Sequence, residues 1–240
     1  MAKICCTIQL IGGTIGLIKF IMIMTKWRYA FYLLLLVYAL NGQSKFGIKA
    51  GANFAQFSEM ELSGGVDMKW MDGIYLSCFM EKDLGYYFNV QPSFAFVQKG
   101  YRVEGIDTNL QIRGSSNTSI SYVQVGSNLN FKIIDRDVMW TINGGGSIAF
   151  ALFGLNELKL FPPSGETSAT TRLEFGRDAN RRVDFEIYLG TGLSIPIGAL
   201  YLLLDAGYGW GILDIEERND AFHPQNRSMR TTLGVAWRIK

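Results

Sequence analysis

The chain has 240 residues, which is enough for one large domain or two small ones. Charged residues make up 18%, below the usual quarter for soluble domains, whereas aromatic residues reach 13% and glycine is frequent. The net charge is only +2 and no basic cluster is interleaved with aromatic residues, so the composition argues against a nucleic-acid partner.

The N-terminal part of the chain has the pattern of targeting segments. Lys26 and Arg28 precede a short apolar run that ends in small and polar residues, which predicts a secretory signal peptide over residues 24–43. Residues 1–23 are also apolar, and two interpretations fit them: an upstream start codon wrongly included in the gene, or an N-terminal membrane helix. Both predict that the chain leaves the cytoplasm, and the remaining residues, 44–240, are expected to form one domain.

The remainder of the chain alternates between apolar and polar residues in repeated runs, without an amphipathic helix of ordinary length. The pattern predicts eight strands, most of them about ten residues or longer, which is the length of a tilted membrane-spanning strand. The predicted strands lie near residues 46–54, 73–80, 87–103, 121–133, 139–153, 184–194, 202–212 and 227–239.

The predicted connections alternate in length. Those after the second, fourth and sixth strands are short, with the sequences EKDLG, IDRD and PIGA. The others are long and polar, at residues 55–72, 104–118, 155–182 and 214–226. Short periplasmic turns and long extracellular loops are typical of outer-membrane barrels. The sequence therefore predicts an all-β fold, an eight-stranded antiparallel up-and-down transmembrane β-barrel that follows a signal peptide.

The two faces of each predicted strand differ in chemistry. In the segment DFEIYLGTGLS, carboxylates and glycines alternate with large apolar side chains. Small residues suit the narrow interior of an eight-stranded barrel, whereas uncharged apolar faces would aggregate in water and are required in lipid. We therefore predict a polar interior and a lipid-facing apolar exterior. Trp140, Trp210 and Trp237 are expected at the membrane interfaces, with ordinary strand packing as the alternative.

Charged residues of both signs occur on the predicted inner faces, where ion pairs can offset their desolvation. Asp184, Glu186 and Asp205 also raise the alternative of a catalytic carboxylate pair, which needs two acids at a cleft. Because the lumen of eight strands should be filled by side chains, we favour a structural network over catalysis and over a pore. The residues predicted to form this lumen network are Lys49, Asp184, Glu186, Asp205, Arg230 and Arg238.

No other catalytic or metal-binding pattern is evident. His223 is the only histidine, and its position in a polar loop near Asp220 does not establish a catalytic triad. Cys78 is the only cysteine outside the N-terminal segments, so an intramolecular disulfide is excluded and we expect it to pack as a small apolar residue. The sequence therefore predicts no enzymatic activity, no cofactor and no metal.

Four segments resemble the PorT-like outer-membrane β-barrel family of the Bacteroidetes: FGIKAGANFAQFS, YVQVGSNLNFKI, DFEIYLGTGLSIPIGALYLLLDAGYGWGILDI and RSMRTTLGVAWRIK. The resemblance covers about residues 46–240 and implies an eight-stranded barrel without enzymatic activity. The founding member of that family assists a protein secretion system. This chain departs from the usual terminal signal for barrel insertion because it ends in Lys240 instead of an aromatic residue, so insertion would rely on Trp237 and Ile239.

We therefore expect a non-enzymatic protein in the outer membrane of a Gram-negative bacterium of the Bacteroidetes. It would act through its extracellular loops in envelope integrity, adhesion or assistance to protein secretion. Its expected partners are outer-membrane lipid and lipopolysaccharide, the barrel-assembly machinery, and secretion-system or surface proteins bound through the long loops. The alternatives are a periplasmic lipocalin-like barrel, whose apolar face would surround a small ligand, and a small outer-membrane enzyme.

Overall fold

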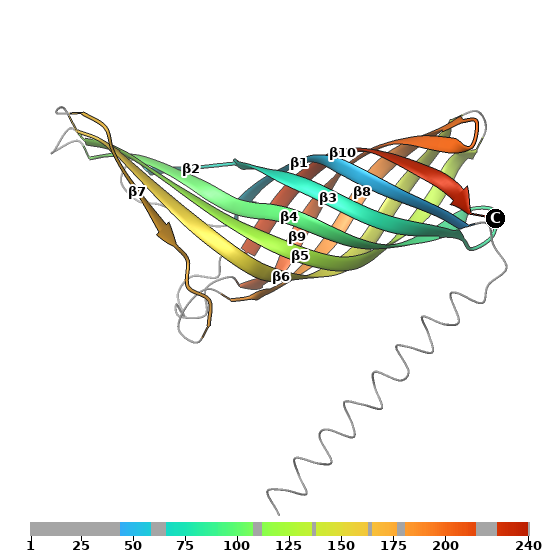
Figure 1. Cartoon of the computed structure of the whole chain (residues 1–240), viewed down its shortest axis with the longest axis horizontal. Coiled ribbons are helices and arrows are strands. Elements are labelled where there is room, and N and C mark those ends of the chain that lie inside the picture. Colours follow the sequence, from blue (N-terminus) through green and yellow to red (C-terminus); the bar gives the residue numbers. More distant parts are fainter. Residues whose placement is uncertain are drawn as a thin grey trace, which may run out of the picture. The chain divides into compact units, whose positions relative to one another are not determined.

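The computed structural model describes residues 44–58, 66–107, 112–135, 138–162, 165–176, 181–214 and 225–239. Within these ranges the chain forms ten antiparallel strands in one sheet (Figure 1). The strands are β1 (Ser44–Phe57), β2 (Val66–Lys69), β3 (Met71–Asp83), β4 (Phe88–Asp107), β5 (Ile112–Asp135), β6 (Met139–Phe161), β7 (Thr167–Arg172), β8 (Val183–Ile197), β9 (Leu200–Asp214) and β10 (Gln225–Ile239).

Two of the predicted segments, 1–23 and 24–43, lie outside the described residues, as does His223. In the part of the chain that is described, no helix is long and apolar enough to cross a membrane.

The strand pairings close into a ring. Around the ring the order is β1, β3, β4, β5, β6, β8, β9 and β10, and each strand is antiparallel to its neighbours. The ring closes where β1 pairs with β10 along its whole length, from Ser44 opposite Ile239 to Phe57 opposite Asn226. A closed ring leaves no row of unpaired backbone groups along these strands, which is the condition for a sheet to cross hydrocarbon.

The prediction of eight strands missed β2 and β7. These short strands pair with parts of β4 and β6 that continue beyond the ring: Lys69 lies opposite Arg102, and Leu155 lies opposite Arg172. The prediction of polar loops at residues 104–118 and 155–182 was correspondingly wrong over much of their length, because β5 begins at Ile112 and β6 continues to Phe161. In Figure 1 these continuations project from one end of the ring, opposite the C-terminus.

The reason for this error is visible in the sequence of β5. Its first part, RGSSNTS, carries polar or small residues on both faces and so lacks the alternation that reveals a strand with one apolar face. We call this part of the sheet the extension: β2, β7, residues 100–107 of β4, residues 112–119 of β5 and residues 154–161 of β6.

The opposite end of the ring has short connections between β3 and β4, β5 and β6, and β8 and β9. The last of these is a two-residue turn in which Gly198 has a φ of 64°, a left-handed conformation that glycine adopts without steric cost. We call this end the short-turn end. Its position agrees with the short connections that the sequence predicted.

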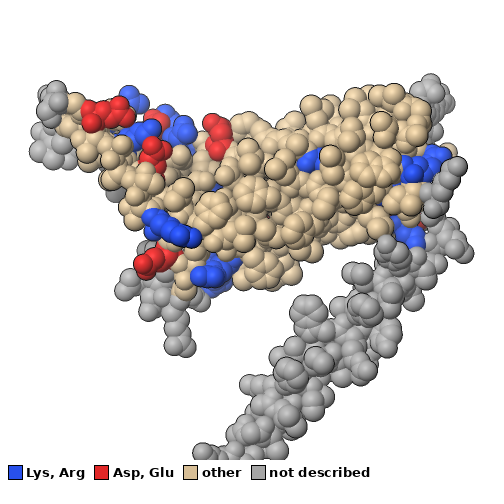
Figure 2. All heavy atoms as spheres, in the orientation of Figure 1, with Lys and Arg blue, Asp and Glu red and all other residues tan. Residues whose placement is uncertain are grey.

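Alternation along each strand separates the side chains inside the ring from those outside it. On β8, Asp184 and Glu186 are each 2% exposed, whereas Leu189 on the other face is 53% exposed. Figure 2 shows the same separation from outside: a broad middle zone consists mostly of uncharged residues, and charged residues gather toward the two ends. The polar face is therefore inside and the apolar face outside, as predicted.

Aromatic side chains mark the outer surface near the strand ends. Trp140 and Trp237 lie near the short-turn end and Trp210 near the other end, and each is about two-fifths exposed. Near the short-turn end, Phe88 packs against Phe131 with ring centroids 5.3 Å apart. Exposed aromatic residues at both ends of an apolar zone are expected at membrane interfaces.

The interior is too narrow for a side chain at every inward position. A Cβ added at Gly51 would lie 1.9 Å from the carbonyl oxygen of Thr231, and one at Gly207 would lie 2.3 Å from the hydroxyl of Tyr188. Inward glycines therefore make room for the large side chains of neighbouring strands, which is why the polar faces are rich in glycine.

Candidate functional site

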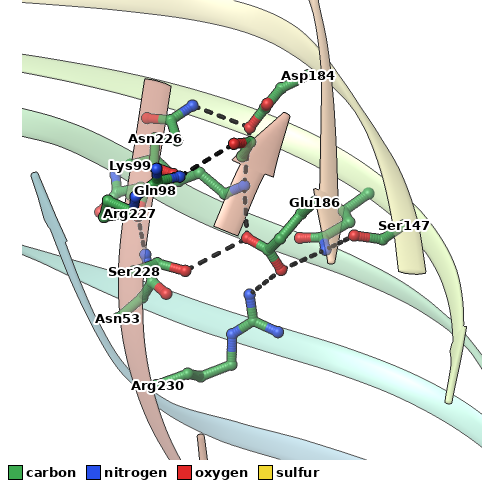
Figure 3. Close-up of polar contacts among 12 residues, drawn as sticks. Asn53, Gln98, Lys99, Ser147, Asp184, Glu186, Asn226, Arg227, Ser228 and Arg230 are labelled. Atoms are coloured by element: carbon green, nitrogen blue, oxygen red, sulfur yellow. Dashed lines mark hydrogen bonds and ion pairs between the residues drawn. The ribbon is translucent and has the colours of Figure 1, made fainter. Parts of the chain in front are cut away.

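The most highly connected site is a cluster of four charged side chains inside the ring. Asp184 and Glu186 project from β8, Lys99 from β4 and Arg230 from β10 (Figure 3). The Nζ of Lys99 lies 3.0 Å from Asp184 and 2.7 Å from Glu186. The Nη2 of Arg230 lies 3.0 Å from the other oxygen of Glu186. We call these four residues the Glu186 cluster; its two cations balance its two carboxylates.

Neutral polar side chains also donate hydrogen bonds to both carboxylates, at Oδ2 of Asp184 and at both oxygens of Glu186. Asn226 donates to Asp184 at 2.9 Å, and Gln124 donates to Glu186 at 3.3 Å. The hydroxyl of Ser228 donates at 3.3 Å to Oε2 of Glu186, the oxygen that Lys99 also contacts. Because each buried charge has an opposite charge, and the carboxylates accept further hydrogen bonds, their desolvation is offset.

Aromatic rings flank the cations of the cluster. The guanidinium carbon of Arg230 lies 4.2 Å from the ring centroid of Tyr75 and 5.2 Å from that of Tyr188. The Nζ of Lys99 lies 5.7 Å from the ring centroid of Tyr122. These contacts add cation–π attraction and keep the long side chains in one orientation.

A second interior pair involves two more of the predicted residues. The Nζ of Lys49 lies 3.0 Å from a carboxylate oxygen of Asp205 and also donates to Gln91 at 3.1 Å. Asn143 donates to the other oxygen of Asp205 at 3.4 Å. Asp205 therefore does not join Asp184 and Glu186 in one carboxylate group.

Two further ion pairs lie nearer the short-turn end. Lys45 is 2.7 Å from Glu81, and Lys132 is 2.8 Å from Asp83. Arg238, which the sequence placed in the lumen network, is exposed and donates to the hydroxyl of Tyr201. It makes no ion pair with any residue that the structure describes.

Sequence reasoning missed Lys99, the completely buried cation of the Glu186 cluster. The signal was present, because Lys99 lies on the same face of β4 as Asn89 and Gln91, an even number of positions further along. Between Gln91 and Lys99 the same face carries Ala95 and Val97, which interrupt its polar pattern.

Apolar side chains pack inside the ring next to the Glu186 cluster. Leu173 and Phe175, which follow β7, pack against an inner layer that includes Val97, Ile120 and Tyr122. The backbone NH of Leu173 donates to the carbonyl of Gly154 at 2.9 Å, which holds this segment to β6. These two side chains therefore extend the apolar inner layer toward the end of the ring opposite the short turns.

Little space remains between the charged clusters. The cavity lined by Tyr188, Asp205 and Arg230 has a volume of about 30 Å³. A cavity needs about 10–15 Å³ of such space to hold one water molecule, so this one accommodates a few waters at most. In the described ranges, no group of three or more His, Cys, Asp or Glu side chains is placed to hold a metal ion.

Residues 40–217 match the family model described as outer membrane protein beta-barrel domain. The chain belongs to this family. A comparison with curated proteins finds no sequence match.

Several solved structures of outer-membrane proteins are similar in fold. Ail, the attachment invasion locus protein of Yersinia pestis, is 17% identical, with 83% of this chain and 100% of that chain covered and a TM-score of 0.37. A major outer membrane protein from Thermus thermophilus is 15% identical, with 82% and 99% covered and a TM-score of 0.43. The outer membrane protease OmpT from Escherichia coli is 6% identical, with 82% and 97% covered and a TM-score of 0.42.

Membership of the outer membrane β-barrel family explains the contrast between the two surfaces of the ring. The apolar residues outside face lipid, in which they need no partner. The charged residues inside are removed from bulk water, and each cation of the Glu186 cluster and of the Lys49–Asp205 pair is within 3.0 Å of a carboxylate. The arrangement can bind the strands together across the barrel, because every one of these pairs joins strands that are not sequence neighbours.

Proposed function

We propose that this protein is a non-enzymatic outer-membrane barrel with a filled interior, which holds the extension at the cell surface and acts through it. The observation that carries the proposal is the occupied interior: the Glu186 cluster and the Lys49–Asp205 pair leave a cavity of about 30 Å³ between them. A barrel filled in this way can serve as a membrane anchor. The extension is the part of the sheet that continues beyond this anchor.

The two ends of the barrel support an orientation. Short turns are typical of the periplasmic end, and long connections of the extracellular end. We therefore place the short-turn end in the periplasm and the extension outside the cell.

The exposure of apolar side chains supports the membrane barrel over a lipocalin-like binding protein. Such a protein would place its apolar face around the ligand, whereas here Ile187 is 52% exposed and Glu186 is buried. The ion pairs of Asp184 and Glu186 likewise support a structural role over catalysis, since neither carboxylate borders a cleft of substrate size.

Two measurements test the proposal that the protein is a membrane barrel with a filled interior. The folded protein should migrate differently on SDS gels before and after boiling, and it should give no stable, large currents in planar bilayers. Recovery of the processed protein in soluble form from the periplasm would contradict the membrane placement. Large single-channel currents from the wild type would contradict the filled interior.

A shortened hairpin tests the role of the extension. Arg102 lies opposite Asn117 in the β4–β5 ladder, so replacing residues 103–116 with Asn-Gly keeps the register of the barrel intact. This variant should insert and show normal heat-modifiability but lose the surface function of the protein. If it complements a deletion strain fully, the proposal that the extension carries the function is wrong.

The same deletion strain separates three finer roles. Loss of secreted proteins from the medium would support assistance to secretion, the role of the founding member of the PorT-like family of the Bacteroidetes. Increased sensitivity to detergent would support envelope integrity, and reduced attachment to surfaces would support adhesion.

A further inference from the structure

The outward face of the extension carries a hollow that the barrel does not need. It has a volume of about 670 Å³ and is lined by Arg102, Glu104, Arg113, Ser115, Asn117, Glu157, Lys159 and Phe161. Opposed residues in the ladder share a face, so the pairings of Arg102 with Asn117 and of Ser115 with Lys159 place these side chains together.

The hollow continues the lipid-facing surface of the barrel. On β4, Phe94 faces outward and is 52% exposed, and Arg102 and Glu104 follow on the same face at even spacing. The outward residues therefore change from apolar to charged along one strand. In a membrane, the charged residues just beyond the apolar zone lie at the level of the lipid headgroups.

The cations of the hollow are incompletely neutralised. Lys69 and Arg113 share one oxygen of Glu104, at 2.5 and 3.4 Å. Arg102 has no carboxylate within ion-pair distance among the described residues. A guanidinium without a carboxylate partner is suited to bind phosphate through two parallel hydrogen bonds.

The hollow also offers acceptors for hydroxyl groups. The side-chain oxygen of Asn117 is buried and accepts no hydrogen bond from a described residue. Glu157 adds a carboxylate, 3.2 Å from Lys159, and the ring of Phe161, 40% exposed, borders the hollow as an apolar surface. Hydroxyl acceptors, an aromatic surface, the guanidinium of Arg102, which is unpaired among the described residues, and the nearby guanidinium of Arg113 together match a sugar that carries phosphate, and match a bare phosphate less well.

We propose that this hollow binds the phosphorylated sugar headgroup of a glycolipid in the outer leaflet that surrounds the barrel. Arg102 and Arg113 bind the phosphate, and Asn117 accepts a hydrogen bond from a sugar hydroxyl. The inference rests on the proposed membrane placement and assigns a ligand class to the extension.

The test uses the full barrel refolded in detergent and transferred to nanodiscs that contain either phosphorylated lipid A or the same lipid after enzymatic dephosphorylation. Retained lipid is quantified by mass spectrometry after purification. The wild type should retain the phosphorylated form about tenfold better, which corresponds to about 1.4 kcal/mol. The double variant R102Q/R113Q should lose this preference, and N117L should weaken retention of both forms.

The matched control is R238Q, which removes an exposed arginine at the opposite end of the barrel and should retain the wild-type preference. The inference is overturned if folded R102Q/R113Q keeps the preference, or if the wild type retains both lipids equally. It is also overturned if a soluble sulfated polysaccharide binds while the two lipids are not distinguished. Failure to insert into membranes would contradict the proposed function instead, so the two failures are distinguishable.

Discussion

The strands β4, β5 and β6 pass without a break through two different surroundings. They are 20, 24 and 23 residues long, and their first or last parts form the barrel while the rest forms the extension. In the barrel, apolar residues face outward and the inward face is mostly polar, because one face meets lipid and the other a packed interior. In the extension, segments such as RGSSNTS carry polar or small residues on both faces, and the alternation disappears although the hydrogen-bonded ladder continues.

Ion pairs differ between the two regions in the same way. The Arg230–Glu186 pair is buried, with side-chain exposures of 9% and 2%, whereas the Lys159–Glu157 pair of the extension is 41% and 40% exposed. Both distances are close to 3 Å, at 3.0 and 3.2 Å. Equal geometry therefore does not mean equal energy, because burial determines the cost of losing a partner.

The largest effect is expected from Glu186→Gln. Arg230 would lose its only carboxylate partner among the described residues and remain buried, which typically costs about 3–5 kcal/mol. The free energy of unfolding, measured with urea for the barrel in lipid vesicles, should fall by that amount. Glu157→Gln in the extension should change it by less than about 0.5 kcal/mol. Equal losses for the two variants would contradict the distinction between the regions.

The next effect concerns the outer surface. Leu189→Arg places a charge at the middle of the lipid-facing side of β8 and should destabilise the barrel by about 2–4 kcal/mol. Thr170→Arg on β7, which lies in the extension, should be close to neutral. The same vesicle-based unfolding assay compares them, and a tolerated Leu189→Arg would show that this face does not meet lipid.

A smaller effect is expected from Gly51→Ala. The new methyl group would lie 1.9 Å from the carbonyl oxygen of Thr231, a backbone atom that cannot rotate away, so the barrel should lose about 1–3 kcal/mol. At Gly114 in the extension, the closest atom to a new methyl group is 3.4 Å away, on the side chain of Leu160. Gly114→Ala should therefore leave the midpoint of unfolding nearly unchanged, and a loss equal to that of Gly51→Ala would show that crowding is not specific to the interior.

The smallest effect is local and depends on pH. The hydrogen bond from Lys69 lowers the pKa of the Glu104 carboxyl below its ordinary value of 4.5, with a further lowering contribution from Arg113. Because the folded value is the lower one, the stabilising contact is present above pH 4.5 and is lost as pH falls through the lowered value.

Hydrogen exchange measures this loss directly. Amides of β2 should exchange faster as the pH falls below the ordinary carboxyl pKa of 4.5, after correction for the intrinsic rate, whereas those of β10 should not. Glu104→Gln should abolish the difference. Unchanged protection of β2 in the wild type would indicate that the Lys69–Glu104 contact does not hold this strand.

Much of the barrel could be predicted from residue order. The alternation on β8 identified Asp184 and Glu186 as inward and Phe185 as outward, because two surroundings impose a period of two on a strand. The PIGA turn was also predictable, since Pro196 and Gly198 interrupt the pattern. The extension was not predictable in this way, because a strand with polar or small residues on both faces, such as RGSSNTS, has no period to detect.

The same limit applied to the interior site. Alternation shows which charges point inward but not which of them meet, since pairing depends on how the ring closes. Lys99 and Asp184 are 85 positions apart and lie on strands that are not neighbours, yet their side chains meet at 3.0 Å across the interior. The order of residues thus determined whether each side chain faces the interior or the outside, because each strand by itself has one face toward lipid and one toward the interior. Closure of the barrel decided the partners, because only the completed ring brings opposite walls within the reach of a side chain.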